Sequence, residues 1–151
     1  MKVLKFGGTS VGSVESIRQI QQIIAQQSDD CVVVVSALGG ITDQLLHAAH
    51  LALQADDTYM EVYQTIRQRH LDMANSLIDN MTTRQMLCHE LENILDELRS
   101  ILFGVHLVKD LSAKSEAAIV SYGEQLSSRI VTAALPGAVR KDSLQFIRTD
   151  H

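Results

Sequence analysis

The stretch KFGGTSVG, residues 5–12, follows a short apolar run at the start of the chain and precedes a helical pattern. Residues 2–6 predict a strand, and residues 14–26 predict a helix because apolar side chains recur every three or four positions. Ser13 or Gly12 is the expected N-cap. A strand, glycine loop and helix in this order either bind an anion through backbone N–H groups or form an ordinary turn. The spacing alone leaves both interpretations open.

The next apolar run, CVVVVSA at residues 31–37, is rich in β-branched residues and has no polar alternation. It predicts a strand buried on both faces. Two such strands separated by a helix imply a right-handed parallel crossover, so the chain begins as an α/β domain. A further helix is expected to run to about Leu53, with Thr42 as its cap.

The middle of the chain predicts an antiparallel helical hairpin, inserted into the α/β domain at about residues 57–103. One helix is expected over residues 59–77, followed by a break at residues 79–83. Leucine and isoleucine then alternate in steps of four and three over residues 87–101, the spacing of a helix packed along a neighbouring helix. Gly104 is expected to end this second helix.

The last third of the chain predicts one long helix and one strand. Ser112 or Ser115 is the expected cap of the helix, and residues 136–137, Pro-Gly, are expected to end it. Residues 144–150, LQFIRTD, predict a third strand.

Composition narrows the class of protein. The 151 residues carry a net charge of −5 and no basic cluster longer than two residues, which argues against nucleic-acid binding. No apolar run is long enough to span a membrane, and no signal peptide is recognisable. Cys31 and Cys88 lie far apart and are expected to be reduced thiols. His47 and His50 are one helical turn apart but lack a third ligand, so no metal site is predicted.

Two loops follow the predicted parallel strands and are expected to lie at the same edge of the sheet, where ligands bind in open α/β sheets. Lys5 ends the first strand, where it either faces an anion or extends to the edge of the sheet. The second loop, SALGGITD at residues 36–43, supplies the hydroxyls of Ser36 and Thr42. These hydroxyls either contact a ligand or serve only as a strand end and a helix cap.

A third stretch, SYGEQLSSR at residues 121–129, places a glycine within a predicted helix. Glycine there costs about 1 kcal/mol relative to alanine, so close approach of another backbone or a ligand is expected at Gly123. Glu124 follows it. On the residues alone, a packing glycine beside a solvated glutamate is the favoured interpretation.

Taken together, these stretches resemble the aspartokinases and, more broadly, the amino acid kinase superfamily. The resemblance rests on KFGGTSVG at residues 5–12, VVVSALGGITD at residues 33–43 and IVSYGEQLSS at residues 119–128. FGVHLVKDLSAKSEA, residues 103–117, is similar to the corresponding run in bifunctional aspartokinase–homoserine dehydrogenases. The resemblance implies a three-layer α/β/α fold with a mainly parallel sheet, here truncated.

The resemblance also implies a reaction and its site: transfer of the γ-phosphoryl group of ATP, with Mg²⁺, to the side-chain carboxylate of L-aspartate. This is the first step towards lysine, threonine and methionine. Lys5 matches the lysine that contacts the transferred phosphate and stabilises the transition state. Glu124 matches the glutamate that binds the amino group of the substrate, which reverses the interpretation from the residues alone. The loop near the nucleotide phosphates matches Gly7, Gly8, Thr9 and Ser10, and the aspartate-binding loop matches Ser36 and Thr42.

Two departures from the family pattern stand out. Leu144 occupies the place of an arginine, and the chain ends at His151, before the family's GRGGSD motif and its regulatory domains. We therefore expect residues 1–151 to be the N-terminal part of a longer, cytoplasmic, homo-oligomeric enzyme, inactive without the ATP-binding half. The alternatives are an amino acid kinase acting on glutamate or a carbamate, and a non-catalytic regulatory subunit on the same scaffold.

Overall fold

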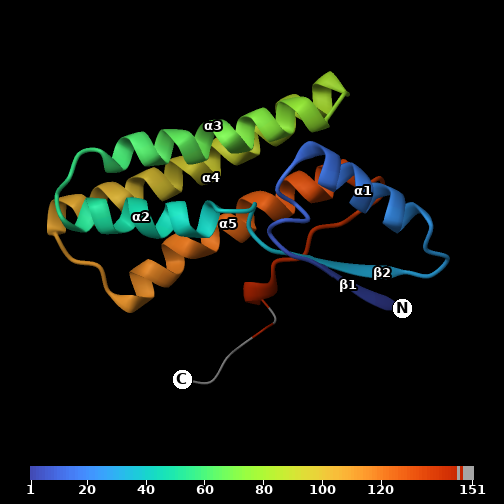
Figure 1. The fold of residues 1–151 in the computed structure, drawn as a ribbon, viewed down its shortest axis with the longest axis horizontal. Coiled ribbons are helices and arrows are strands. Elements are labelled where there is room, and N and C mark those ends of the chain that lie inside the picture. The colour runs from blue at the N-terminus through green and yellow to red at the C-terminus, as the bar shows by residue number, and fades with distance from the viewer. Residues whose placement is uncertain (146, 148–151) are drawn as a thin grey trace.

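The computed structural model describes residues 1–145 and residue 147, and its elements alternate between strand and helix only at the start of the chain (Figure 1). The elements are β1 (Lys2–Phe6), α1 (Val14–Ala25), β2 (Cys31–Val35), α2 (Ile41–Leu53), α3 (Tyr59–Leu77), α4 (Met81–Val108), α5 (Ala113–Ala134) and a 3-10 turn, η1 (Ser143–Gln145).

Strands β1 and β2 form a parallel pair, with Lys2 opposite Cys31 and Phe6 opposite Val35. Helix α1 makes the crossover between them, and the backbone N–H of Ser36 donates to the carbonyl of Phe6 at 3.1 Å. Both strands therefore end at the same edge of the sheet. The predicted α/β fold with a parallel sheet is confirmed.

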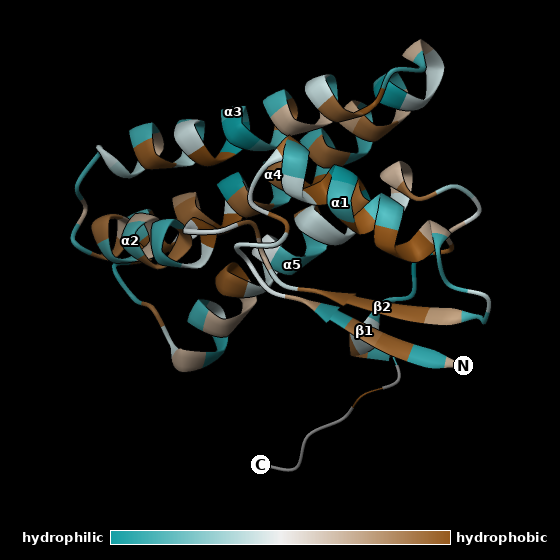
Figure 2. Ribbon diagram, turned by 45° about the vertical axis from the view of Figure 1, so that its right-hand side comes forward, coloured by the Kyte–Doolittle hydropathy of each residue, from teal (hydrophilic) through white to brown (hydrophobic). Residues whose placement is uncertain are grey.

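The prediction that β2 is buried on both faces is wrong for the described part of the chain. Val32 and Val34 are 45% and 44% exposed, whereas Val33 and Val35 pack against the core. Successive side chains of a strand point to opposite faces, and the helices lie to one side of this sheet (Figure 2). Hydrophobic residues colour most of both strands in Figure 2, so composition alone does not reveal which face is covered.

Helices α3 and α4 form the predicted antiparallel hairpin (Figure 1). Tyr59 at the start of α3 packs against His106 near the end of α4, with 5.1 Å between the ring centroids. Further along, the Tyr63 hydroxyl donates to the Leu95 carbonyl at 3.1 Å. Both helices also contact α2 and α5, so the hairpin shares one core with the rest of the chain.

Two predicted ends within the hairpin are wrong. The break covers residues 78–80 instead of 79–83, because the Asn80 side chain accepts from the Thr83 N–H and caps α4 at Met81. Gly104 does not end α4, which continues to Val108. A glycine costs a helix only about 1 kcal/mol, and burial of the following residue, Val105, favours continuation.

The predicted boundaries of the other helices are close to those observed. Ser13 caps α1 by accepting from the Ser16 N–H, and Ser112 caps α5 in the same way. Helix α5 ends at Ala134, just before the Pro-Gly pair. The strand predicted at residues 144–150 is not observed at its start, where Leu144 lies in η1, and most of the remainder lies outside the described residues.

The core lies mainly among the helices. The largest fully buried side chains include Ile17, Leu38, Ile41, Leu45, Tyr63, Ile66, Leu91, Leu95, Leu98, Leu102 and Ile119. Among the residues that the structure describes, no helix combines the length and the apolar character needed to cross a membrane.

Candidate active site

The loops that follow β1 and β2 contact each other backbone to backbone. A Cβ atom added at Gly8 would lie 3.1 Å from the Ala37 carbonyl oxygen, and one added at Gly39 would lie 3.2 Å from the Gly8 carbonyl oxygen. A Cβ atom at Gly12 would lie 3.1 Å from that same Gly8 oxygen. Such distances are tighter than most Cβ contacts, so a side chain at these positions would force the neighbouring backbone to shift, and glycine favours this close approach.

Helix α5 contacts the second loop through side chains on little more than one helical turn, residues 123–127. Oε1 of Glu124 accepts from the backbone N–H of Ala37 at 3.4 Å, a long hydrogen bond. The buried hydroxyl of Ser127 donates to the carbonyl of Ser36 at 2.7 Å. A Cβ atom at Gly123 would lie 2.7 Å from the Ala37 Cβ atom, so the close approach expected at this glycine is observed. The structure thus brings Ser36 and Glu124 together.

Lys5 is exposed, which contradicts the expectation of a lysine in a strand buried on both faces. It shares the uncovered face of β1 with Val3, whereas Leu4 and Phe6 on the opposite face are half-buried. The pleat of the strand explains the exposure, because it turns alternate side chains away from the helices. In the part of the chain that the structure describes, no ion pair involves Lys5.

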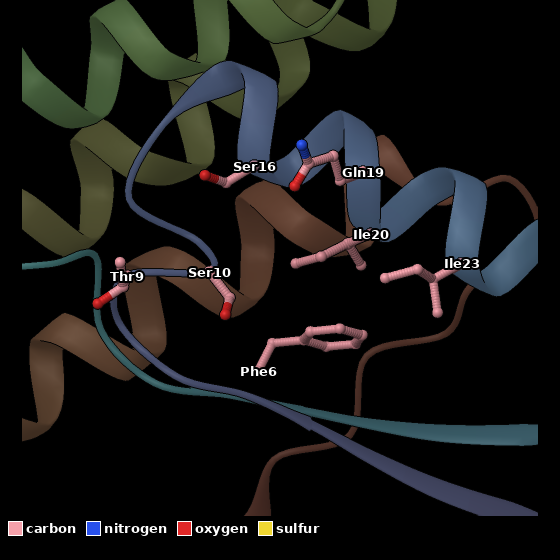
Figure 3. Close-up of a pocket in the computed structure, with 7 residues that line it drawn as sticks. All are labelled: Phe6, Thr9, Ser10, Ser16, Gln19, Ile20 and Ile23. Atoms are coloured by element: carbon pink, nitrogen blue, oxygen red, sulfur yellow. The ribbon is translucent and has the colours of Figure 1, made fainter.

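The hydroxyl residues of the first loop, Thr9 and Ser10, are exposed and line a pocket of about 280 Å³ (Figure 3). Phe6 and Ile20 give this pocket an apolar side between the strand and α1, and Ile20 lies above the Phe6 ring (Figure 3). The other lining residues are Ser16, Gln19 and Ile23. The loop therefore combines exposed hydroxyls with an apolar recess at its base.

Thr42 is not the cap of α2, in contrast to the prediction. The N-cap is Gly40, whose φ of 81° places it in the left-handed region and which has no side chain to form a capping hydrogen bond. Helix α2 therefore begins at Ile41, and Thr42 lies half-buried in its first turn. Without a side-chain cap, the positive end of the helix dipole remains directed at the second loop.

Arg69 of α3 contacts both loops, and no motif in the sequence predicts this role. Its guanidinium donates to the Gly39 carbonyl through Nη1 at 2.5 Å and to the Gly12 carbonyl through Nη2 at 3.4 Å. One side chain of the hairpin therefore bonds to both strand-end loops. An arginine on an amphipathic helix is ordinarily a solvated residue, so only the tertiary structure reveals this role.

The described side chains provide few ligands for a metal ion that is bound by the protein alone. No group of three or more His, Cys, Asp or Glu side chains that could bind one occurs among residues 1–145 and 147. Nε2 of His50 lies 3.1 Å from Glu116 of α5 and so connects α2 with α5.

Comparisons with known proteins agree with this geometry. The profile described as the amino acid kinase family matches residues 1–146. Chloroplastic aspartokinase 2 of Arabidopsis thaliana is 32% identical over 137 residues, which are 88% of this chain and 24% of that protein. A bifunctional aspartokinase/homoserine dehydrogenase 2 of the same plant is 28% identical over 144 residues, 95% of this chain and 15% of that protein.

Among solved structures, aspartokinase III of E. coli in complex with aspartate and ADP matches with a TM-score of 0.78 and 24% identity. The match covers 89% of this chain and 28% of that one. The chain thus spans about a quarter or less of the length of these relatives. Because the family profile covers almost the whole sequence, the chain belongs to the amino acid kinase family.

Proposed function

We propose that this chain forms the aspartate side and the phosphate loop of an aspartate kinase. The observation that carries the proposal is the convergence of three separate stretches: the two glycine loops in backbone contact, and Glu124 at the Ala37 amide. The relatives that match most of the chain are aspartokinases, which supports aspartate over other amino acid substrates.

In the proposed site, Glu124 binds the amino group of L-aspartate, because its carboxylate is exposed yet is held near the second loop by the Ala37 amide. Ser36 in the second loop and Thr42 in the first turn of α2 contribute polar contacts. The N-terminus of α2, which has no side-chain cap, adds partial positive charge next to them, and this charge suits a substrate carboxylate.

In the proposed reaction, the side-chain carboxylate oxygen of aspartate bonds to the γ-phosphorus of ATP as the bond from that phosphorus to the β,γ-bridging oxygen breaks, and ADP leaves. Lys5 provides positive charge for the transferred group. The backbone of Gly7, Gly8, Thr9 and Ser10 lies along the phosphates. Positioning and electrostatic stabilisation carry such a transfer without a covalent enzyme intermediate.

Mg²⁺ in this proposal neutralises the nucleotide phosphates. The scarcity of clustered carboxylates in the described residues fits an ion held mainly by phosphate oxygens and water. We further propose a cytoplasmic location and a homo-oligomeric full-length enzyme serving lysine and threonine synthesis. The free thiols of Cys31 and Cys88 fit a reducing compartment.

The direct test is isothermal titration calorimetry of this chain with L-aspartate, L-glutamate and ATP. We expect saturable aspartate binding, a weaker response to glutamate, and a loss of aspartate affinity of about tenfold or more in Glu124→Gln, because a charge-assisted contact is removed. Glu116→Gln on the same helix is the matched control, since its carboxylate pairs with His50 away from the loops.

Equal or tighter binding of L-glutamate would assign the chain to a different amino acid kinase. No aspartate binding at millimolar concentration, or equal losses in Glu124→Gln and Glu116→Gln, would refute the proposed role of Glu124. Binding measurements suit this chain better than turnover, because the chain corresponds to about a quarter of its kinase relatives.

A further inference from the structure

We propose that Arg69 is a positioning residue, which fixes the two strand-end loops relative to each other and makes the geometry of the site depend on helix α3. None of the three motif stretches contains Arg69, and it lies more than 25 positions from either loop in the sequence. The contacts of Arg69 are the physical basis of this inference. Its consequence for the site rests on the proposed function.

The contacts of Arg69 reach one carbonyl from each loop. Nη1 donates to Gly39, in the loop after β2, and Nη2 donates to Gly12, in the loop after β1. A guanidinium is planar and presents its donors in a fixed fork, so two bonds from one group define the distance between the two carbonyls. A lysine ammonium at this position could not impose that geometry.

The guanidinium lies next to the second loop at Gly40. A Cβ atom built at Gly40 would lie 3.9 Å from Nη1 of Arg69, an ordinary van der Waals distance. The loops already touch each other at Gly8 and Gly39. Arg69 therefore adds hydrogen bonds to two loops that are otherwise in van der Waals contact here. These bonds oppose sliding of one loop past the other.

The helix that carries Arg69 is itself held in place. Neighbouring residues on α3, Ile66 and His70, are fully buried, so the rotation of the helix is fixed by the core. Arg67, two positions earlier, forms an ion pair with Glu92 of α4. Because Arg69 extends from this anchored helix, we infer that the hairpin sets the separation of the loops.

The test compares Arg69→Met with Arg67→Met, which removes an arginine from the same helix but leaves the loops untouched. Amide hydrogen exchange, followed by NMR, measures directly how often the hydrogen bonds of the loops open. The Val11 N–H bonds to the Gly7 carbonyl at 3.2 Å, and the Ile41 N–H bonds to the Leu38 carbonyl at 2.9 Å. Loss of a charge-assisted hydrogen bond is expected to raise the exchange rates of these two amides by about tenfold in Arg69→Met. In Arg67→Met they are expected to stay within about twofold.

Arg69→Lys provides a second variant that keeps the charge and serves if Arg69→Met does not fold. Faster loop exchange in Arg69→Lys than in the wild-type chain supports the forked bridge, whereas wild-type rates in Arg69→Lys overturn it. Equal loop rates in Arg69→Met and Arg67→Met overturn the inference as well. Urea unfolding of each variant separates a loop effect from a general loss of stability.

A parallel titration with L-aspartate keeps this inference distinct from the proposed function. If the wild-type chain binds aspartate, we expect Arg69→Met to weaken that binding, and unchanged affinity would contradict the link to the site. If the wild-type chain does not bind aspartate, the proposed function fails, while the exchange rates still decide whether Arg69 positions the loops.

Discussion

His70 shows how one side chain sets a pH limit on stability. Its ring is fully buried on α3, Nδ1 lies 2.7 Å from the Ile66 carbonyl oxygen, and Nε2 has no hydrogen-bond partner among the described residues. Burial lowers the pKa of His70 to about 4, the hydrogen bond to Ile66 opposes this shift, and the nearby charge of Arg69 adds to it. The ring is therefore neutral at physiological pH, and its Nδ1–H donates to Ile66.

We expect the folded state to lose stability as the pH falls from about 6.5 towards 4. In the unfolded chain His70 binds a proton near pH 6.5, whereas in the folded chain it does so only near pH 4. Between these values the unfolded state holds more protons, so acid favours unfolding, by up to about 3 kcal/mol. The measurement is the free energy of urea unfolding as a function of pH.

His70→Asn retains an amide donor but cannot titrate, so its stability is expected to vary less with pH over this window. His89→Asn on the exposed surface of α4 is the control and should keep the wild-type pH dependence. Similar slopes for His70→Asn and the wild-type chain would show that another group titrates.

At the scale of elements, the position of α5 depends on the absence of a side chain at Gly123. A methyl group there would lie 2.7 Å from the Ala37 Cβ atom and 3.4 Å from Cδ1 of Leu45. The Ala37 methyl is fixed to the backbone of the second loop and cannot rotate away. The glycine that weakens α5 as a helix is therefore the residue that allows α5 to contact the loop.

Gly123→Ala is expected to destabilise the fold by about 1–3 kcal/mol, although alanine is the better helix former. Gly104→Ala is the matched control, because a Cβ atom there meets nothing within 4 Å. That variant should gain up to about 1 kcal/mol. Urea unfolding of both variants gives the comparison, and a Gly123→Ala chain as stable as Gly104→Ala would contradict the close packing.

At the scale of the whole molecule, the sheet has one covered and one open face among the described residues. Val33 and Val35 of β2 pack towards the helices, whereas Val32 and Val34 point away from them. Lys5 lies on the open side as well, with its ammonium accessible. The difference between the two faces therefore determines which side chains of β2 contribute to stability, and it leaves Lys5 accessible.

Val33→Thr is expected to cost about 1–2 kcal/mol, because a hydroxyl replaces a methyl against the core. Val34→Thr should stay within about 0.5 kcal/mol of the wild-type chain, since threonine suits a strand and its hydroxyl reaches solvent. Both variants have β-branched side chains, so the difference in their unfolding free energies shows which face of β2 packs against the core. Equal costs would show that both faces of β2 are covered.

Much of the fold was predictable from local patterns. The β-branched run of β2, the apolar spacing of α1 and the serine caps of α1 and α5 depend on residues close together in sequence. The less accurate predictions involve competition between local and distant effects. Gly104 is typical of a helix end, but the residue after it, Val105, is buried and favours continuation of α4. Thr42 is typical of a helix cap, but Gly40 already occupies the N-cap position of α2.

The sequence by itself determined the order of the first two strands and the five helices, the hairpin, and the three stretches that carry the family resemblance, because periodicity and loop chemistry are local properties. Only the tertiary structure decided that Arg69 bonds to both loops, that Gly123 makes room for Ala37, and that Lys5 lies on an open face. These features depend on which distant surfaces meet, and the packing of the whole chain sets those contacts.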